Sequence, residues 1–321
     1  MTYRVALIGA GNIGTWHARQ WAALPDAEIV GVLDPRTDAA EAVGPAYTDW
    51  NTLLAQAKPD IVDICTPTPQ HREGVERAAA AGKAVFVEKP LARTLADCDA
   101  IVAAVQKAAV PAMSGHVLRF FPESAGAKRL VVAGGVGVPA AIRTARMGGL
   151  PDLGDRPNWY LDPVQSGGVV LDLILHDFDW LRWTFGPVTR VYARGRLDYA
   201  LVTLRFASGA VGHVTGSWAH PGGFRTTLEV AGDVGLVEHD SARSVPLSSC
   251  LRAPGGGGSG VTLPQSPLAP TDDPYYLELQ AFVQALTRGT APPVTVEEGR
   301  EATRIGLAAL ESMETGKVVA L

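Results

Sequence analysis

A glycine-rich turn near the N-terminus has the residue types and spacing that bind a pyrophosphate. Gly9, Gly11 and Gly14 form the pattern GxGxxG between an apolar run and a helical pattern. The first glycine permits a tight turn, the second lets the backbone approach a phosphate, and the third lets helix and strand pack closely. The first N–H groups of the following helix, at Asn12 and Ile13, would face the phosphates. These five positions are predicted to bind a dinucleotide.

An acidic residue at the end of the next apolar run indicates which dinucleotide is bound. Asp34 lies twenty residues after Gly14, the spacing of a carboxylate that binds the adenosine ribose hydroxyls. A carboxylate at this position repels a 2′-phosphate, so the sequence favours NAD. Arg36 follows two residues later and keeps NADP open, because it can contact a 2′-phosphate. It can also stack on adenine or be a solvated surface charge.

The segments around this turn indicate a parallel sheet covered by helices. Short runs rich in Val and Ile alternate with helical patterns over the first 120 residues. Strands are expected at Val5–Ile8, Ile29–Leu33, Ile61–Cys65, Ala84–Val87 and Val110–Met113, and helices at Ile13–Ala23, Gly74–Ala81 and Leu95–Ala108. Strands that are apolar on both faces and alternate with helices predict a doubly wound α/β Rossmann domain. We expect this dinucleotide-binding domain to cover residues 1–120.

The pattern changes in the second part of the chain, where short connections join alternating strands and favour an antiparallel sheet. Strands are expected at Val188–Arg196, Tyr199–Phe206, Ala210–Trp218 and Arg225–Ala231, and helices at Ser124–Val132, Val169–Phe185, Tyr275–Thr287 and Val296–Thr315. The Gly- and Pro-rich stretch Ala253–Pro270 is expected to be a surface loop or strand insertion. Residues 121–321 are predicted to form an α+β domain with a largely antiparallel open sheet, for substrate binding and oligomerisation.

The composition excludes several classes of protein. The chain has 321 residues, with 28 Lys and Arg against 33 Asp and Glu, a net charge of −5. A mildly acidic chain without a basic run is a poor partner for nucleic acid or an anionic membrane. Three scattered cysteines without a CxxC pair predict neither disulfides nor a metal site, and favour a reducing compartment. With no export or membrane-spanning segment expected, the sequence predicts a cytoplasmic protein.

Three further motifs follow predicted strands or open the long helix of the second domain. They are Thr66-Pro67-Thr68-Pro69 with His71, Glu88-Lys89-Pro90, and Gly167-Gly168 with Asp172 and His176. In this order they resemble the Gfo/Idh/MocA family, named for glucose–fructose oxidoreductase, inositol dehydrogenase and a rhizopine-catabolism protein. The resemblance covers nearly the whole chain and extends to Arg205-Phe206, Ser217-Trp218 and the closing Ser312–Gly316.

The resemblance implies a nicotinamide cofactor in the N-terminal domain and a polyol or sugar against the C-terminal sheet. It adds to the cofactor site the residues Thr66, Pro67, His71, Glu88 and Lys89. It also implies that Lys89, Asp172 and His176 carry out catalysis and contact the substrate.

Physical chemistry supports these catalytic roles. Asp172 and His176 are four residues apart in one expected helix, so both side chains would lie on the same face within contact distance. The carboxylate would fix the tautomer of the imidazole, and His176 would exchange the hydroxyl proton as hydride moves. Lys89 follows a parallel strand, where open α/β sheets bind ligands, and its ammonium would stabilise the substrate oxygen. The alternatives are a core histidine bonded to Asp172 and a surface lysine.

Four other residues are secondary candidates for the substrate pocket. Arg119 follows the last strand of the first domain and would hold a hydroxyl or form an interdomain salt bridge. Asn158 and Tyr160 precede the Gly-Gly pair and would line a sugar pocket, or the aromatic ring would cap the helix packing. Tyr275 begins a helix that can reach the site, with core packing as its alternative.

The sequence therefore predicts an oxidoreductase that transfers hydride between NAD or NADP and a secondary hydroxyl or ketone of a sugar, inositol or related polyol. Two alternatives within the family are a dinucleotide-binding regulator without turnover and a glycosidase that oxidises its substrate transiently with bound NAD. The presence of Lys89, Asp172 and His176 favours the enzyme over the regulator. An open sheet face in the second domain predicts a homodimer or homotetramer.

Overall fold

The computed structural model describes residues 2–151, 153, 158–243 and 273–321, so the expected loop Ala253–Pro270 lies outside the described residues. The chain divides into two compact units, residues 1–120 with 266–303, and residues 121–265 with 304–321. The domain bounds expected from the sequence, 1–120 and 121–321, stay a prediction. The described residues 273–303 group with the first unit. None of the described helices combines the length and apolar character needed to span a membrane.

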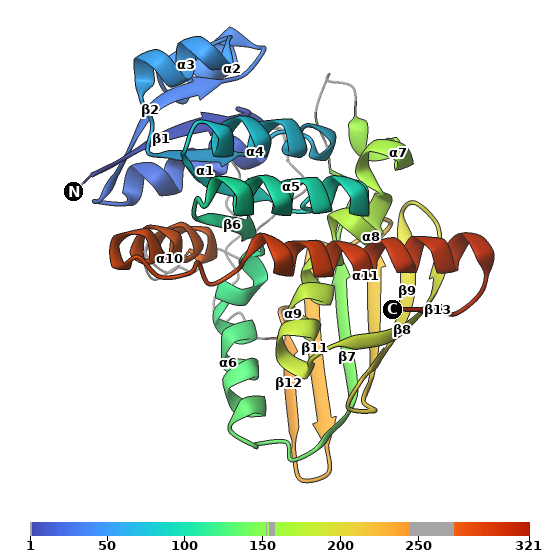
Figure 1. Ribbon diagram of the computed structural model, residues 1–321. Coiled ribbons are helices and arrows are strands. Elements are labelled where there is room, and N and C mark those ends of the chain that lie inside the picture. The colour runs from blue at the N-terminus through green and yellow to red at the C-terminus, as the bar shows by residue number, and fades with distance from the viewer. Residues whose placement is uncertain (1, 152, 154–157, 244–272) are drawn as a thin grey trace. The chain divides into compact units, whose positions relative to one another are not determined.

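The first unit contains sheet A, six parallel strands in the order β3-β2-β1-β4-β5-β6 (Figure 1). Its strands are β1 (Tyr3–Ile8), β2 (Ala27–Leu33), β3 (Ala46–Tyr47), β4 (Ile61–Ile64), β5 (Ala84–Glu88) and β6 (Ala112–Gly115). The chain reverses direction across the sheet between β1 and β4. Ligands bind outside the carboxyl ends of the strands at such a point in doubly wound folds. The predicted Rossmann domain is confirmed.

Helices cover both faces of sheet A, and the alternation of side chains along each strand divides the core between them. The helices of this unit are α1 (Asn12–Ala23), α2 (Thr37–Glu41), α3 (Trp50–Ala57), α4 (His71–Ala80), α5 (Leu95–Ala108) and α10 (Pro274–Arg288), with the 3-10 turns η1 (Thr68–Gln70) and η2 (Val117–Phe120). Val62 and Val85 pack in one cluster with Leu53 and Ile101.

The other core cluster of sheet A explains why α10 belongs to the first unit. Ile61 and Phe86 point to this face, where they pack with Trp21 of α1 and with Leu279 and Phe282 of α10. The rings of Phe86 and Phe282 meet edge to face, with their centroids 5.8 Å apart. The apolar stripe of α10 therefore completes the hydrophobic core of sheet A.

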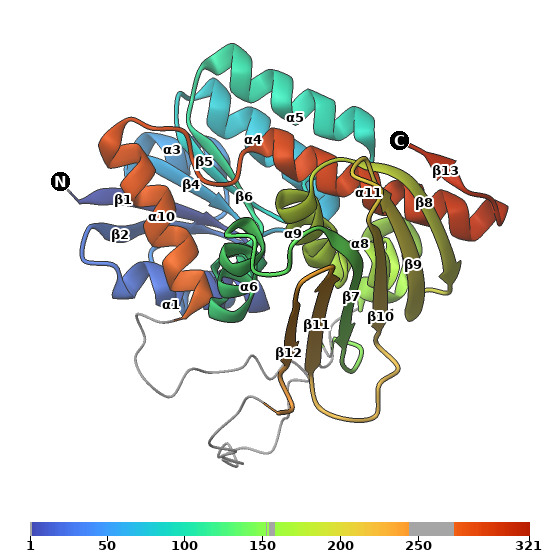
Figure 2. The same cartoon turned by 90° about the horizontal axis from the view of Figure 1, so that it is seen from below.

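The second unit contains sheet B, in the order β12-β11-β7-β10-β9-β8-β13 (Figure 2). Its strands are β7 (Pro139–Met147), β8 (Val188–Gly195), β9 (Tyr199–Phe206), β10 (Val211–Ser217), β11 (Arg225–Gly232), β12 (Leu236–Asp240) and β13 (Val319–Ala320). Among the described strand pairs of sheet B, only β7–β10 is parallel. The predicted, largely antiparallel sheet is confirmed, although β7, β12 and β13 were not among the expected strands.

The remaining helices follow the order of the chain. They are α6 (Pro122–Val132), the 3-10 turn η3 (Trp159–Leu161), α7 (Pro163–Ser166), α8 (Gly168–Asp172), α9 (Leu175–Phe185) and α11 (Val296–Thr315). The division between the two units falls within α11, which begins in the first unit and ends in the second.

The single helix expected over Val169–Phe185 is wrong, because α8 ends at Asp172 and α9 begins at Leu175. The N–H groups of Leu173 and Ile174 both donate to the carbonyl of Val169, which widens the turn to a five-residue spacing. A Cβ at Gly216 of β10 would lie 2.6 Å from Cγ2 of Ile174, so the glycine admits this turn against sheet B. Asp172 and the following His176 therefore do not share a continuous helical face.

Candidate functional site

The glycine-rich turn between β1 and α1 has the backbone geometry that its sequence predicts. Gly9 has a φ of +98°, in the left-handed region that favours glycine, and a Cβ there would lie 2.8 Å from the carbonyl oxygen of Cys65. A Cβ at Gly14 would overlap the carbonyl of Gly9. Gly11 is different, because a Cβ there would meet no other group within 4 Å. The first and third glycines are required by packing, whereas the second leaves open space for a ligand.

Two observations show that this turn fits a dinucleotide. No side chain caps the N-terminus of α1, which begins directly after Gly11. The hydroxyl of Thr66, just beyond β4, is buried and has no hydrogen-bond partner within the described structure. Its backbone nitrogen would lie 3.1 Å from a Cβ at Gly9, so Thr66 and Pro67 adjoin the turn. A buried hydroxyl without a partner is unfavourable, and a cofactor held by the helix N-terminus would supply that partner.

Asp34 follows β2 and is held by the same turn. Its carboxylate accepts hydrogen bonds from the backbone of Ala10 at 2.7 Å, and from the backbone and Nε of Arg36 at 2.9 and 3.1 Å. Burial raises the pKa of Asp34, but the hydrogen bonds from Arg36 and Ala10 outweigh burial and leave the pKa below its ordinary value. The ionised carboxylate can accept from ribose hydroxyls. The Arg36 side chain is 41% exposed and lies against the carboxylate instead of extending into solvent.

His71 links the two loops that follow β4 and β5. Its Nδ1 lies 2.9 Å from the carbonyl oxygen of Pro90, and its Nε2 lies 2.9 Å from that of Thr66. The ring is buried, which lowers the pKa of His71, and a neutral imidazole donates to only one carbonyl at a time. Both ring nitrogens face backbone carbonyls, so His71 holds the two loops together.

Lys89 follows β5, at the edge of sheet A where Thr66 follows β4. Its backbone N–H donates to Oε2 of Glu88 at 3.0 Å, and the Lys89–Pro90 peptide bond is cis. The Glu88 side chain is buried. Its carboxylate contacts the backbone of Lys89 and the ring of His17, and its role in the cofactor site stays a prediction.

The two remaining catalytic candidates, Asp172 and His176, belong to the second unit. Asp172 ends α8 and His176 is the second residue of α9, and both are partly buried. The next residue, Asp177, forms a buried ion pair with Arg146 of β7, with its Oδ2 2.9 Å from Nε. This pair fixes the start of α9 on sheet B and thereby the position of the His176 backbone.

Arg119 and Tyr275 have structural partners within the first unit. The Arg119 side chain is 3% exposed, and its Nη1 lies 3.0 Å from Oε1 of Glu298. Arg119 and Glu298 both belong to the first unit. Their ion pair is therefore not the salt bridge between domains that was the alternative for Arg119. Tyr275 packs against Trp16 and His17, with ring centroids 6.3 and 5.8 Å away.

Asn158 and Tyr160 shape the loop before α8 in the second unit. Asn158 accepts a hydrogen bond from the backbone of Tyr160 at 3.1 Å and donates to the carbonyl of Pro151 at 2.7 Å. The Tyr160 ring stacks on Trp159 at 4.3 Å and meets Trp218 edge to face at 6.0 Å. The amide of Asn158 is thus used within the loop, while the three aromatic rings pack in one cluster.

Comparison with known proteins agrees with this geometry. Residues 3–116 match the model of an oxidoreductase family with an NAD-binding Rossmann fold, and residues 125–238 match the GFO/IDH/MocA C-terminal domain. The chain belongs to the Gfo/Idh/MocA family. It is 32% identical to myo-inositol 2-dehydrogenase of Thermotoga maritima, covering 99% of this chain and 98% of the relative. It is 31% identical to scyllo-inositol 2-dehydrogenase (NAD(+)) of Bacillus subtilis, covering 99% and 96%.

A solved structure extends the likeness to three dimensions. GenD2 from gentamicin A biosynthesis, crystallised in complex with NAD, superposes with a TM-score of 0.89 at 25% identity, covering 100% of this chain and 96% of GenD2. The resemblance to the Gfo/Idh/MocA family drawn from the motifs is therefore confirmed, as are the fold and the NAD-binding domain.

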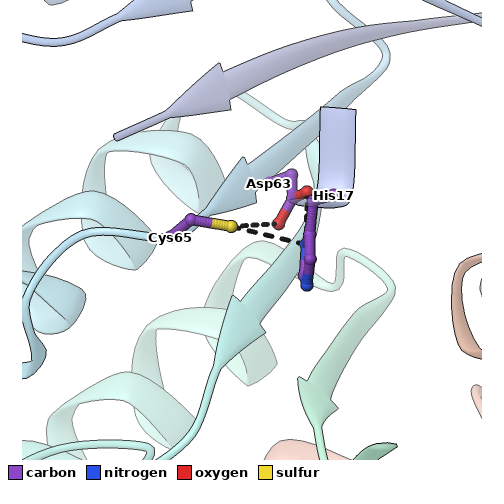
Figure 3. A group of neighbouring side chains, drawn as sticks. All are labelled: His17, Asp63 and Cys65. Atoms are coloured by element: carbon purple, nitrogen blue, oxygen red, sulfur yellow. Dashed lines mark hydrogen bonds and ion pairs between the residues drawn. The ribbon is translucent and has the colours of Figure 1, made fainter. Parts of the chain in front are cut away.

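Sequence reasoning missed a buried polar group in the Rossmann domain of this family member. His17 of α1, Asp63 of β4 and Cys65 lie within hydrogen-bonding distance of one another, as Figure 3 shows. The Nε1–H of Trp21 also donates to Asp63, at 2.7 Å. A signal was present in the sequence, because an aspartate in the middle of an apolar strand needs buried partners.

Proposed function

We propose that this protein is an NAD-dependent oxidoreductase that transfers hydride between the nicotinamide and a secondary hydroxyl or ketone of an inositol or related polyol. The observation that carries the proposal is the arrangement at the carboxyl edge of sheet A. The glycine turn, the unpartnered Thr66 hydroxyl and Lys89 follow neighbouring strands there. Two full-length relatives are named as inositol 2-dehydrogenases, which supports a cyclic polyol as the substrate.

In the proposed mechanism, bound NAD supplies the hydride acceptor for oxidation of the substrate carbon. His176 takes the proton of the reacting hydroxyl at a ring nitrogen, and returns it when the reaction runs toward reduction. Asp172 orients the His176 ring. The ammonium of Lys89 donates a hydrogen bond to the same oxygen and stabilises its developing negative charge. Arg119, Asn158, Tyr160 and Tyr275 stay proposed substrate-binding residues.

Cofactor reduction by the purified protein tests this function. We would assay myo-inositol, scyllo-inositol, aldoses and sugar alcohols with NAD and NADP separately, alongside Lys89→Met and His176→Ala. The proposal expects reduced cofactor with a polyol, faster with NAD, and loss of turnover in both variants. Tight NAD binding without turnover of any polyol would favour the regulator, and glycoside cleavage without net NADH would favour the glycosidase.

We also propose that one face of sheet B joins two copies of this chain. Alternate residues of β9 and β10 are exposed on that face, including Tyr199, Leu201 and Val211 at 45, 57 and 37%. Self-association is the common way to cover such a surface. Sedimentation should find a dimer or tetramer that Leu201→Asp dissociates. Val132→Asp, at an exposed position of α6, is the matched control and should leave the assembly intact.

The cytoplasm is the proposed compartment. Cys65 and Cys98 are free thiols and both are buried. Burial raises the pKa of Cys98 to about 12, which keeps this thiol protonated, and free thiols are typical of reducing compartments. Fractionation of cells that express the protein should recover the NAD-linked activity with cytosolic markers, and recovery from another compartment would contradict this placement.

A further inference from the structure

A buried histidine lies between two carboxylates directly beneath the chain that leads to Lys89. Nδ1 of His17 lies 2.9 Å from Oδ2 of Asp63, and Nε2 lies 3.1 Å from Oε1 of Glu88. The side chains of His17 and Asp63 are fully buried, and that of Glu88 is 7% exposed. The three residues come from α1, β4 and β5, so they join one helix to two neighbouring strands of sheet A. Figure 3 shows His17 and Asp63.

The contacts of the His17 ring bear on its protonation state. Ionised carboxylates only accept hydrogen bonds. Nδ1 of His17 is hydrogen-bonded to Asp63, whereas Nε2 approaches Glu88 at ion-pair distance and has no hydrogen-bond partner among the described residues. Burial by itself lowers the pKa of His17, but Cys65 and Asp63 raise it well above its ordinary value. Burial likewise raises the pKa of Glu88, yet its interaction with His17 leaves it below the ordinary value. The raised pKa of His17 and the lowered pKa of Glu88 both favour an ion pair between these two side chains.

The two oxygens of Glu88 have different partners. Oε1 faces His17, while Oε2 accepts the backbone N–H of Lys89 at 3.0 Å. On the neighbouring strand, a Cβ at Gly115 would lie 2.9 Å from Oε1, so the glycine admits the carboxylate in this position. The position of the Lys89 backbone is thus tied, through one rigidly held carboxylate, to a cation on α1.

We propose that His17 is a positioning residue that acts through Glu88 to hold Lys89 for catalysis. This inference rests on the proposed function for the role of Lys89. The ion pair holds one end of the Glu88 carboxylate, and the other end fixes the amide of Lys89. A misplacement of about 1 Å far from the reacting atoms can cost about a hundredfold in rate, which makes this connection functionally sensitive.

A metal site is the competing use of the same residues. The donor atoms of His17, Asp63 and Cys65 all lie within 4.8 Å of one another. However, Oδ2 of Asp63 already accepts hydrogen bonds from Trp21 at 2.7 Å and from His17 at 2.9 Å. A protonated imidazole has no lone pair for a metal. The hydrogen bonds therefore favour the ionic network, and bound metal is one of the outcomes that the test can return.

Two substitutions of His17 separate positioning from stability. The amide nitrogen of Gln reaches the place of Nε2 and keeps a donor toward Glu88, whereas that of Asn reaches the place of Nδ1 and keeps a donor toward Asp63. Each variant removes the same charge and one contact, so both should lower the melting temperature. His17→Asn should reduce kcat by up to about a hundredfold, the cost of a misplacement of about 1 Å. His17→Gln should retain most of kcat, and the KM for NAD should change little in either variant.

Equal loss of kcat in His17→Asn and His17→Gln would overturn the proposal, as would stoichiometric zinc in the purified wild-type protein. Hydrogen exchange at the Lys89 amide provides a readout that does not require turnover. Exchange should be faster in His17→Asn than in His17→Gln, and equal rates would also refute the connection. Failure of the wild-type protein to oxidise any polyol would instead refute the proposed function, and the exchange rates would still decide whether His17 holds Lys89.

Discussion

Replacement of Gly11 by Ala should make the protein slightly more stable and its cofactor binding much weaker. Gly11 has φ −78° and ψ −166°, extended backbone that alanine adopts readily, and a Cβ there would meet no other group within 4 Å. Gly→Ala at such a position stabilises by about 0.4–1 kcal/mol, because the unfolded chain loses conformational freedom. The free energy of unfolding of the cofactor-free variant should therefore be unchanged or higher.

Binding should respond in the opposite direction, because the added methyl group occupies the space through which the backbone approaches the pyrophosphate. A hydrogen bond to a charged group contributes about 1.5–3 kcal/mol, and about 1.4 kcal/mol corresponds to a tenfold change in Kd. Loss of one backbone contact to phosphate thus predicts a Kd for NAD about 10–150-fold higher.

Urea unfolding of the cofactor-free protein and calorimetric titration with NAD measure the two effects separately. Gly14→Ala is the contrasting variant, because its Cβ would overlap the carbonyl of Gly9 and destabilise the fold itself. A Gly11→Ala protein that binds NAD within twofold of wild type would refute the assignment of this turn as the phosphate site. A marked loss of stability would refute the reading of Gly11 as open space.

Three further predictions follow from single contacts. The variant Asp34→Ser keeps Arg36 but removes the carboxylate that repels a 2′-phosphate. Its kcat/KM for NADP, divided by that for NAD, should be about 10-fold or more above the wild-type ratio. An unchanged ratio in steady-state assays would contradict this prediction. His71→Ala should lower the free energy of unfolding by about 1–3 kcal/mol, because a buried backbone carbonyl loses its donor, as urea titration would measure. Arg225 lowers the pKa of Asp240 from 3.8 to about 2. The stability that this ion pair contributes is therefore present above pH 4 and is lost as the pH falls toward 2. The unfolding midpoints of the wild type and of Asp240→Asn should converge over that pH range.

Local patterns in the sequence predicted most of the fold. The helix expected at Leu95–Ala108 and the strand expected at Tyr199–Phe206 have the bounds that the structure gives them. Thr94 caps α5 by accepting a hydrogen bond from the backbone of Asp97 at 3.1 Å, and Ala109 ends it in the left-handed conformation. Such elements are predictable because side chains near in sequence determine where they begin and end.

Long-range packing accounts for what the patterns missed. The apolar stripe of α10 indicates that the helix is covered, but not which sheet covers it, and Phe282 in fact packs on Phe86 of sheet A. The break between α8 and α9 depends on Ile174 fitting against Gly216 of β10, more than forty residues later in the chain. The predicted pairing of Asp172 with His176 assumed a continuous helix, and their catalytic roles stay predictions.

The difference between local patterns and long-range packing also explains which site residues could be predicted from the sequence. The glycines of the turn were predictable because they form a short local pattern, GxGxxG, between a strand and a helix. The partnership of His17, Asp63 and Glu88 was not, because α1, β4 and β5 meet only in the folded sheet. A buried ion pair adds little net stability, since desolvation of the charges offsets their attraction. An apolar group in place of His17 would fill this part of the core at less cost, but it would leave the Glu88 carboxylate without its cation and the Lys89 amide without a fixed acceptor. The energetic reason for burying these charges therefore lies in where they place Lys89.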